Sequence, residues 1–146
     1  MKQEPIVLRR TYDAPVEKVW KAITDIKQMQ QWYMDKLEDF KPEQGFTTSF
    51  TVTNSGKNFV HRWKVTEVIP GKKIAYEWKY DGYPGNSLVT FELVAEGTGT
   101  TLTLTHSGLE TFNPEVYPEL AKEHFSAGWN DLLGSLLKKF VEEKHP

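Results

Sequence analysis

The fold is decided by two neighbouring stretches, FVHRWKV at residues 59–65 and IAYEWKY at residues 74–80. In both, every second residue is apolar or aromatic, and the residues between them are mostly polar or charged. Alternation with a period of two is typical of a β-strand that buries one face. Because only a short segment containing Pro70 and Gly71 joins the two stretches, they predict an antiparallel pair of strands.

The same period continues on both sides of this pair, from residue 45 to residue 107. Further alternating stretches begin at Phe46, Val89 and Leu102, and short segments with glycine, asparagine or proline separate them. Such segments are typical of turns, so this region predicts a meander of five strands. Residues 5–12 show the same alternation and add a first strand. We therefore expect an antiparallel sheet of six strands.

Two short helices are predicted between the first and the second strand. Val16, Val19 and Ile23 recur with the spacing of one helical face, and Asp13 is the expected N-cap of this helix. A second short helix is expected from about residue 25 to residue 33.

The C-terminal segment is predicted to form one long helix over roughly residues 119–143. Apolar residues keep a 3.6-residue period there, and about 25 residues at 1.5 Å each give a length of about 37 Å. The period places Gly128 and Leu136 toward the sheet and Gly134 on the outer side. The order of strand, two short helices, five strands and long helix is an α+β arrangement, expected to form a single domain over residues 1–146.

The composition excludes several classes of function. The 146 residues carry a net charge of −2 without a basic patch, which argues against nucleic-acid binding. No segment approaches the roughly 18 consecutive apolar residues of a membrane span, so no membrane insertion is expected. The chain has no cysteine, which excludes disulfides, thiolate metal sites and a cysteine nucleophile. The N-terminal apolar stretch is too short for a signal peptide, so a cytoplasmic location is expected.

Four histidines raise the question of metal binding. They lie at positions 61, 106, 124 and 145, and none has a second ligand at the spacing of a common zinc motif. The glycine-containing segment at residues 96–100 leads into a strand and not into the helix N-terminus that a phosphate loop requires. We expect neither a metal nor a cofactor.

Several motifs resemble one family in their order and spacing. They are RTYDAPVEKVWKAITD at residues 10–25, QWY at 31–33, EVIPGKKI at 67–74, VTFEL at 89–93, GTTLTLTHSGL at 99–109 and GW at 128–129. Together they resemble the family named after the activator of heat shock protein 90 ATPase. The resemblance covers nearly the whole chain.

The resemblance implies the helix-grip fold, which birch-pollen-type allergens, lipid-transfer (START-like) domains and polyketide cyclases share. In that fold a curved antiparallel sheet grips the C-terminal helix, and a cavity often lies between them. Eukaryotic activators of the family carry a further N-terminal chaperone-binding domain, for which this sequence has no room. The resemblance therefore leaves a chaperone as one possible partner and implies no particular chemistry.

The candidate site is the space between the sheet and the C-terminal helix. The alternation brings aromatic side chains of several strands to this face, and Arg10 and His61 would be inward polar groups that anchor an acidic or hydroxylated ligand end. Two structures fit this pattern, a packed aromatic core or a largely apolar pocket of ~300 Å³ or more for an amphipathic molecule. The residues expected to line the site are Arg10, Tyr12, Phe50, His61, Trp63, Tyr76, Trp78, Phe91, His106, Phe125, Trp129 and Leu133.

Three functions fit the sequence. The first is non-enzymatic binding of a small apolar or amphipathic ligand between sheet and helix. The second is a protein-interaction module that regulates a chaperone ATPase, as the family name suggests. The third is an enzyme of the cyclase or hydratase type, in which Arg10, His61 or Tyr76 orients a polyketide-like substrate. We assign no catalytic residue from the sequence.

Overall fold

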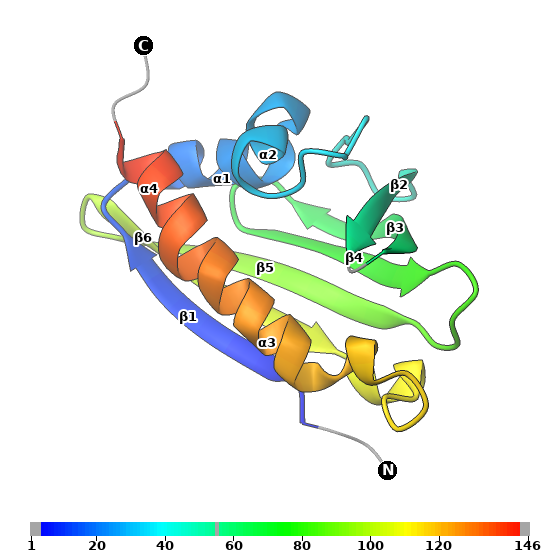
Figure 1. Cartoon of the computed structure of the whole chain (residues 1–146). Helices are drawn as coiled ribbons and strands as arrows, with labels where there is room; N and C mark the ends of the chain where they lie inside the picture. Colours follow the sequence, from blue (N-terminus) through cyan, green and yellow to red (C-terminus); the bar gives the residue numbers. More distant parts are fainter. Residues whose placement is uncertain (1–3, 55, 144–146) are drawn as a thin grey trace.

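The computed structural model describes residues 4–54 and 56–143. Within them, six strands form one antiparallel sheet in the order β1-β6-β5-β4-β3-β2 (Figure 1). This confirms the α+β class and the six-stranded sheet. The strands are β1 (Ile6–Tyr12), β2 (Thr47–Asn54), β3 (Lys57–Ile69), β4 (Lys73–Tyr80), β5 (Ser87–Glu96) and β6 (Gly99–Ser107).

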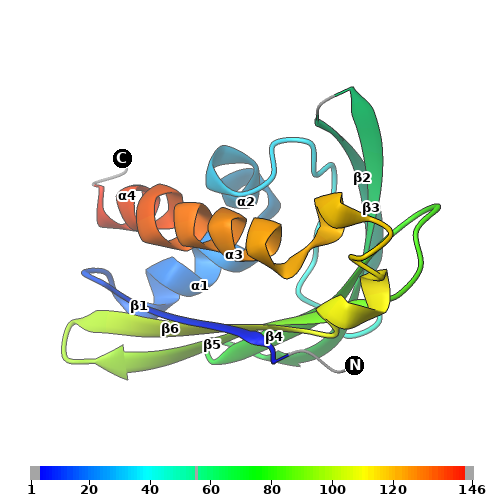
Figure 2. The same ribbon diagram turned by 60° about the horizontal axis from the view of Figure 1, so that its bottom comes forward.

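The C-terminal helix lies along the concave face of the sheet, which confirms the helix-grip arrangement (Figure 2). It consists of α3 (Lys122–Asp131), a π-helical segment η3 (Leu132–Leu136) and α4 (Leu137–Glu142), which follow one another without a break. Strands β2 and β3 curl upward beside the start of α3 (Figure 2). The curvature places the sheet around the helix on two sides.

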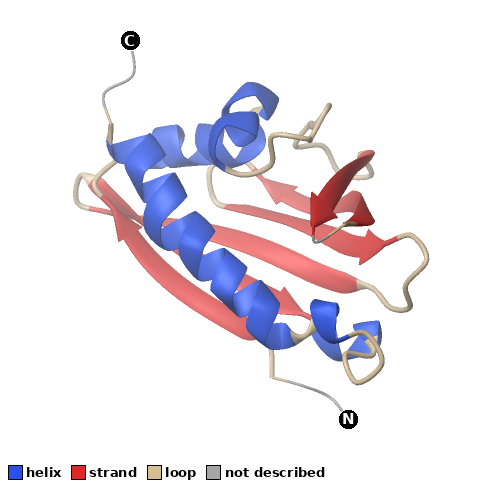
Figure 3. Cartoon of the chain, viewed as in Figure 1, coloured by secondary structure: helices blue, strands red, loops and turns tan. Residues whose placement is uncertain are grey.

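Two short helices connect β1 and β2, as the sequence predicts (Figure 3). They are α1 (Val16–Thr24) and α2 (Ile26–Trp32). The expectation that Asp13 caps α1 is wrong, because Pro15 occupies the N-cap position and Asp13 lies two residues earlier. The backbone N–H of Asp13 instead donates to Oε2 of Glu142, 2.9 Å away, which ties the start of α1 to the end of α4.

The long helix begins later than the sequence predicts. Residues Pro118–Leu120 form a separate 3₁₀ turn, η2, and Ala121 has an extended backbone with φ −70° and ψ 149°. An extended residue interrupts the helical hydrogen bonds, so α3 begins only at Lys122. A further 3₁₀ turn, η1 (Leu109–Phe112), follows β6 and has no counterpart in the sequence prediction.

The π-helical segment changes which residues face the sheet. The backbone N–H of Leu137 donates to the carbonyl of Leu132, which closes a turn wider than that of an α-helix. Trp129, Leu133 and Leu137 are consequently all buried. Leu136, expected on the same face, is 47% exposed, so that expectation is wrong.

The predicted position of Gly134 is also wrong. A β-carbon added at Gly134 would lie 3.6 Å from Nε of Arg10, so this side of the helix faces β1 and not the outside. The Tyr12 hydroxyl, on the same strand, donates to the carbonyl of Leu133 at 2.7 Å. Strand β1 therefore lies beside the π-helical segment and bonds to it through Tyr12.

Candidate ligand-binding groove

The centre of the space between sheet and helix is filled by aromatic side chains. Trp63 stacks on Tyr76 with a centroid distance of 4.6 Å, and Tyr76 lies 6.1 Å from Phe91. Tyr33, which follows α2, inserts between these rings and the helix, 5.6 Å from Trp63 and 5.8 Å from Trp129. Its hydroxyl is hydrogen-bonded to the Tyr76 hydroxyl at 2.6 Å. This part of the predicted site is a packed core.

Trp129 joins the helix to this core. It is 2% exposed, and its ring lies edge-on to Phe91 with a centroid distance of 5.8 Å. Trp129 therefore packs on β5, one of the central strands of the sheet.

His106 belongs to a closed hydrogen-bond network in the same layer. The Trp129 indole N–H donates to Nδ1 of His106 at 3.0 Å, so the His106 proton resides on Nε2. Nε2 donates to the Ser87 hydroxyl at 2.8 Å, which donates in turn to the Trp78 carbonyl at 2.7 Å. Burial lowers the pKa of His106 to about 3, so the ring is neutral and both its nitrogens are engaged.

Arg10 and Tyr12 lie on the side of the helix that faces β1. The Arg10 guanidinium donates to Oδ1 of Asn130 at 2.5 Å and to the carbonyl of Arg9 at 2.9 Å. The Tyr12 hydroxyl is occupied by the carbonyl of Leu133. Both residues therefore bond to α3, to η3 or to their own strand, away from strands β2 and β3.

A groove of about 290 Å³ opens where α3 faces the concave side of β3 and β4. Its volume is at the lower end of the range for ligand sites. Most of its wall is aromatic or apolar, and the polar groups are few. The lining residues are Met34, Asn54, His61, Trp78, Tyr80, Glu119, His124, Phe125, Gly128, Trp129 and Leu132.

The groove combines polar and aromatic groups from β3 and β4. Nδ1 of His61 lies 3.0 Å from the carbonyl of Phe59, an acceptor, so the His61 proton sits on Nδ1 and Nε2 carries the lone pair. Burial lowers the pKa of His61 to about 4, and the ring is neutral. The Trp78 indole N–H is buried and has no hydrogen-bond partner among the described residues.

The mouth of the groove is spanned by an ion pair. Nζ of Lys57, at the start of β3, lies 2.8 Å from Oε2 of Glu119 in η2. This hydrogen bond holds the pKa of Glu119 below its usual range. Two elements that are far apart in the sequence therefore meet over the groove.

Gly128 leaves the helix side of the groove open. A β-carbon added at this position would meet no atom within 4 Å. Glycine in a helix costs about 1 kcal/mol relative to alanine, so the position carries a cost in stability and leaves space for a ligand. The sequence places Gly128 on the correct face of the helix.

The predicted site residues divide into two groups. His61, Trp78, Phe125 and Trp129 line the groove. The other eight do not line it: Arg10, Tyr12, Phe50, Trp63, Tyr76, Phe91, His106 and Leu133. Sequence reasoning missed the remaining lining residues, although Tyr80 follows Tyr76 and Trp78 in the same period of two and could have been included.

The family of the chain follows from a comparison of its sequence with family models. Residues 13–142 match the model described as activator of Hsp90 ATPase homolog 1-like protein. The chain belongs to this family. The match confirms the resemblance inferred from the motifs, and it includes every residue that lines the groove.

Solved structures share the fold of this activator-like chain over nearly its whole length. Protein CV1439 from Chromobacterium violaceum is 23% identical with a TM-score of 0.81, and the match covers 97% of this chain and 99% of that one. Protein MLL2253 from Mesorhizobium loti is 26% identical with a TM-score of 0.76, covering 98% and 100%. Protein BH1534 from Bacillus halodurans is 27% identical with a TM-score of 0.70, covering 97% and 99%. A search of curated proteins found no significant match.

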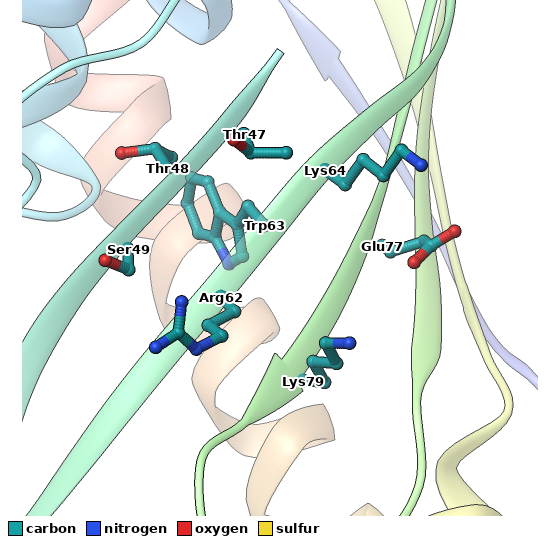
Figure 4. A pocket seen from close by; sticks show the side chains of 8 residues that line it. All are labelled: Thr47, Thr48, Ser49, Arg62, Trp63, Lys64, Glu77 and Lys79. Atoms are coloured by element: carbon teal, nitrogen blue, oxygen red, sulfur yellow. The ribbon is translucent and has the colours of Figure 1, made fainter. Parts of the chain in front are cut away.

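A second hollow, of about 400 Å³, lies over strands β2, β3 and β4 (Figure 4). It is rich in charged and hydroxyl side chains, including Arg62, Lys64, Glu77 and Lys79. Arg62 forms an ion pair with Asp81, and the Glu77 carboxylate accepts from the Asn86 amide. This hollow is a mainly polar surface, and Trp63 is the aromatic residue among those that line it.

Among residues 4–54 and 56–143, no group of three or more histidine or carboxylate side chains is placed to hold a metal ion. His145 lies outside the described residues. No helix within the described ranges is long and apolar enough to cross a membrane.

Proposed function

We propose that this activator-like chain binds a small apolar or amphipathic molecule in the groove between α3 and strands β3 and β4, and does not transform it. The observation that carries the proposal is the groove itself, with a volume of about 290 Å³ and walls that are mostly aromatic or apolar. Ligand sites are typically concave, mostly apolar and equipped with a few polar groups, and this hollow has each property.

Several contacts favour binding over catalysis. Of the three residues expected to orient a substrate, only His61 lines the groove. Tyr76 is hydrogen-bonded to Tyr33 within the core, and Arg10 is bonded to Asn130 on another side of the helix. General acid–base catalysis needs positioned groups within hydrogen-bond reach of one substrate, and these residues are held apart.

The test is to plug the groove from the helix side. Gly128→Phe directs a ring into the groove, and we expect it to weaken binding of the neutral fluorescent probe N-phenyl-1-naphthylamine at least ~tenfold. Ala127→Phe is the matched control, because Ala127 is exposed and does not line the groove. Native mass spectrometry of the purified protein would show whether a small molecule accompanies it. Equal probe binding by wild type and Gly128→Phe would refute the proposed site.

The second candidate function is regulation of a chaperone ATPase, which the family membership favours. The experiment that separates the two measures the ATPase rate of an Hsp90-type chaperone with and without the chain. Stimulation that persists in Gly128→Phe would favour the interaction module, since the plug fills the groove and changes the outer surface only around this position. The cytoplasmic location expected from the sequence stays a prediction.

A further inference from the structure

We propose that the free edge of strand β2 pairs antiparallel with the same edge of a second copy of this chain, across a two-fold axis. Strand β2 is the last strand in the sheet order, so one of its two sides has no neighbouring strand (Figure 1). The proposal concerns the assembly of the chain and does not depend on a ligand in the groove.

The backbone of β2 is bonded on one side and open on the other. Just before β2 begins, the Val65 N–H donates to the Phe46 carbonyl at 2.8 Å, in the register that β2 and β3 then keep. Residues of an antiparallel strand alternate between bonding to the neighbour and pointing away from it, so the even-numbered residues of β2 bond to β3. Four exposed residues direct their backbone N–H and carbonyl groups away, and no group in the described part of the chain bonds to them. They are Thr47, Ser49, Thr51 and Thr53.

Nothing in the sequence of β2 protects this edge. Natural sheets blunt their edges with charges, prolines, bulges or very short strands. Residues 44–54 contain no charge and no proline, and threonine, phenylalanine and valine favour strands. The register with β3 is continuous over all 8 residues of β2, so no bulge turns the strand away. An open, uncharged edge of this length is a template for another strand.

The opposite edge of the sheet, β1, is protected. It carries Arg9 and Arg10, and the Arg10 guanidinium donates to the Arg9 carbonyl at 2.9 Å. Charged side chains on an edge strand discourage pairing. The β2 edge of one copy therefore finds no open β1 edge on the next, which disfavours head-to-tail pairing into a fibre.

A second copy of β2 fits the open edge by symmetry. A two-fold axis beside Phe50, perpendicular to the sheet, sets Thr47 opposite Thr53 of the second copy. Ser49 then lies opposite Thr51, and all four outward-pointing residues have a backbone partner.

The absence of charge favours a second copy over a different protein. Two-fold symmetry sets a strand against itself, so a charged residue near the axis would face a like charge, which is destabilising. Strand β2 carries no charge and meets no such repulsion. A strand of another protein is commonly selected by complementary charges, and this edge offers none.

Sedimentation velocity of the full chain, over a concentration series up to ~200 µM, tests the proposal. We expect the wild type to reach twice the mass of one chain. Ser49→Lys with Thr51→Lys makes a lysine variant, and Ser49→Glu with Thr51→Glu makes a glutamate variant. Each variant sets like charges opposite each other, so the dissociation constant of each alone should rise at least ~tenfold.

Mixing the two variants distinguishes charge repulsion from damage to the strand. An equimolar mixture should recover the dimer, because lysine then faces glutamate across the axis. Val7→Lys with Thr11→Lys is the matched control, since both residues are exposed on the other edge strand; it should dimerise like the wild type.

Amide hydrogen exchange, resolved by NMR, locates the interface within β2. In the wild-type dimer, the outward-pointing amides of Ser49 and Thr51 should exchange slowly, as the amides of Phe50 and Val52 do through their bonds to β3. In the lysine variant, the Thr47 and Thr53 amides should exchange faster than in the wild type, and those of Phe50 should stay slow.

Four results would overturn the proposal. They are a wild type that stays monomeric at ~200 µM, a lysine variant as dimeric as the wild type, a mixture no more dimeric than its components, and open assemblies larger than a dimer. If the substituted chains do not fold, the wild type decides. A wild-type dimer in which the Ser49 and Thr51 amides exchange as fast as exposed amides would place the interface elsewhere.

Discussion

Acid should destabilise this protein well above the pH range in which carboxylates titrate. His61 and His106 are both buried and neutral, and burial lowers their pKa values from 6.5 to about 4 and about 3. As the pH falls below 6.5, the unfolded chain binds protons at these two positions before the folded chain does. The stabilisation is therefore complete above the unfolded pKa of 6.5 and is lost as the pH falls toward the folded values.

The magnitude follows from the same pKa values. At about pH 5, an unfolded histidine is almost fully protonated, whereas a folded histidine of pKa about 4 or lower is almost fully neutral. Protonation of the unfolded chain at each histidine then lowers the unfolding free energy by about 2 kcal/mol relative to its value at about pH 7.5. The two histidines together lower it by about 4 kcal/mol. Asp81, Glu119 and Glu142 also have lowered pKa values, but their loss falls mainly below this window.

Urea unfolding followed by tryptophan fluorescence, at a series of pH values between about 5 and about 7.5, measures this dependence. His61→Gln and His106→Gln should each remove about half of the change in unfolding free energy with pH, whatever their effect on stability at neutral pH. His124→Gln is the control, because His124 is exposed and should leave the change nearly intact. A stability that stays flat across this window in the wild type would refute the reasoning, since it would mean that these rings are not buried and neutral.

Three further predictions test the packing of the helix and the mouth of the groove. Trp129→Ala should lower the unfolding free energy by ~3–5 kcal/mol, measured from urea midpoints, and a change below ~1 kcal/mol would mean that the helix docks differently. Tyr12→Phe should cost about 1–2 kcal/mol in the same assay, because it removes a buried hydrogen bond to the Leu133 carbonyl; an unchanged stability would show that this bond does not support the helix. Lys57→Gln should speed release of N-phenyl-1-naphthylamine in stopped-flow fluorescence, because it breaks the ion pair with Glu119; Lys57→Arg should retain the wild-type rate, and equal rates for both variants would exclude a role for the pair.

The architecture could be predicted because its signals are local. Alternation such as that from Phe59 to Val65 specifies a strand and the face that it buries within one segment, and short turns then fix which strands are neighbours. Trp129 could be predicted as buried for a similar reason, since it lies on the apolar face of the helix. These parts required no knowledge of distant contacts.

The details of the helix and of the groove depend on residues far apart in the sequence. Tyr12 bonds to the carbonyl of Leu133, 121 positions later, beside the π-helical turn that brings Leu137 inward in place of Leu136. Lys57 and Glu119 are separated by 62 positions. No period within one segment reports such pairs, so neither the phase of the helix nor the mouth of the groove could be derived from the sequence pattern.

The sequence left a packed core and a pocket as alternatives, and the structure contains both in adjacent places. Tyr33 fills the centre of the space between sheet and helix, where it contacts Trp63 and Trp129 and bonds to Tyr76. Nearer the start of the helix, Gly128 has no side chain and so leaves space between the helix and strands β3 and β4. Trp129 belongs to both regions, since it lines the groove on one side and packs on Phe91 on the other. A ligand in the groove would therefore rest on a rigid aromatic core and need not displace any part of it.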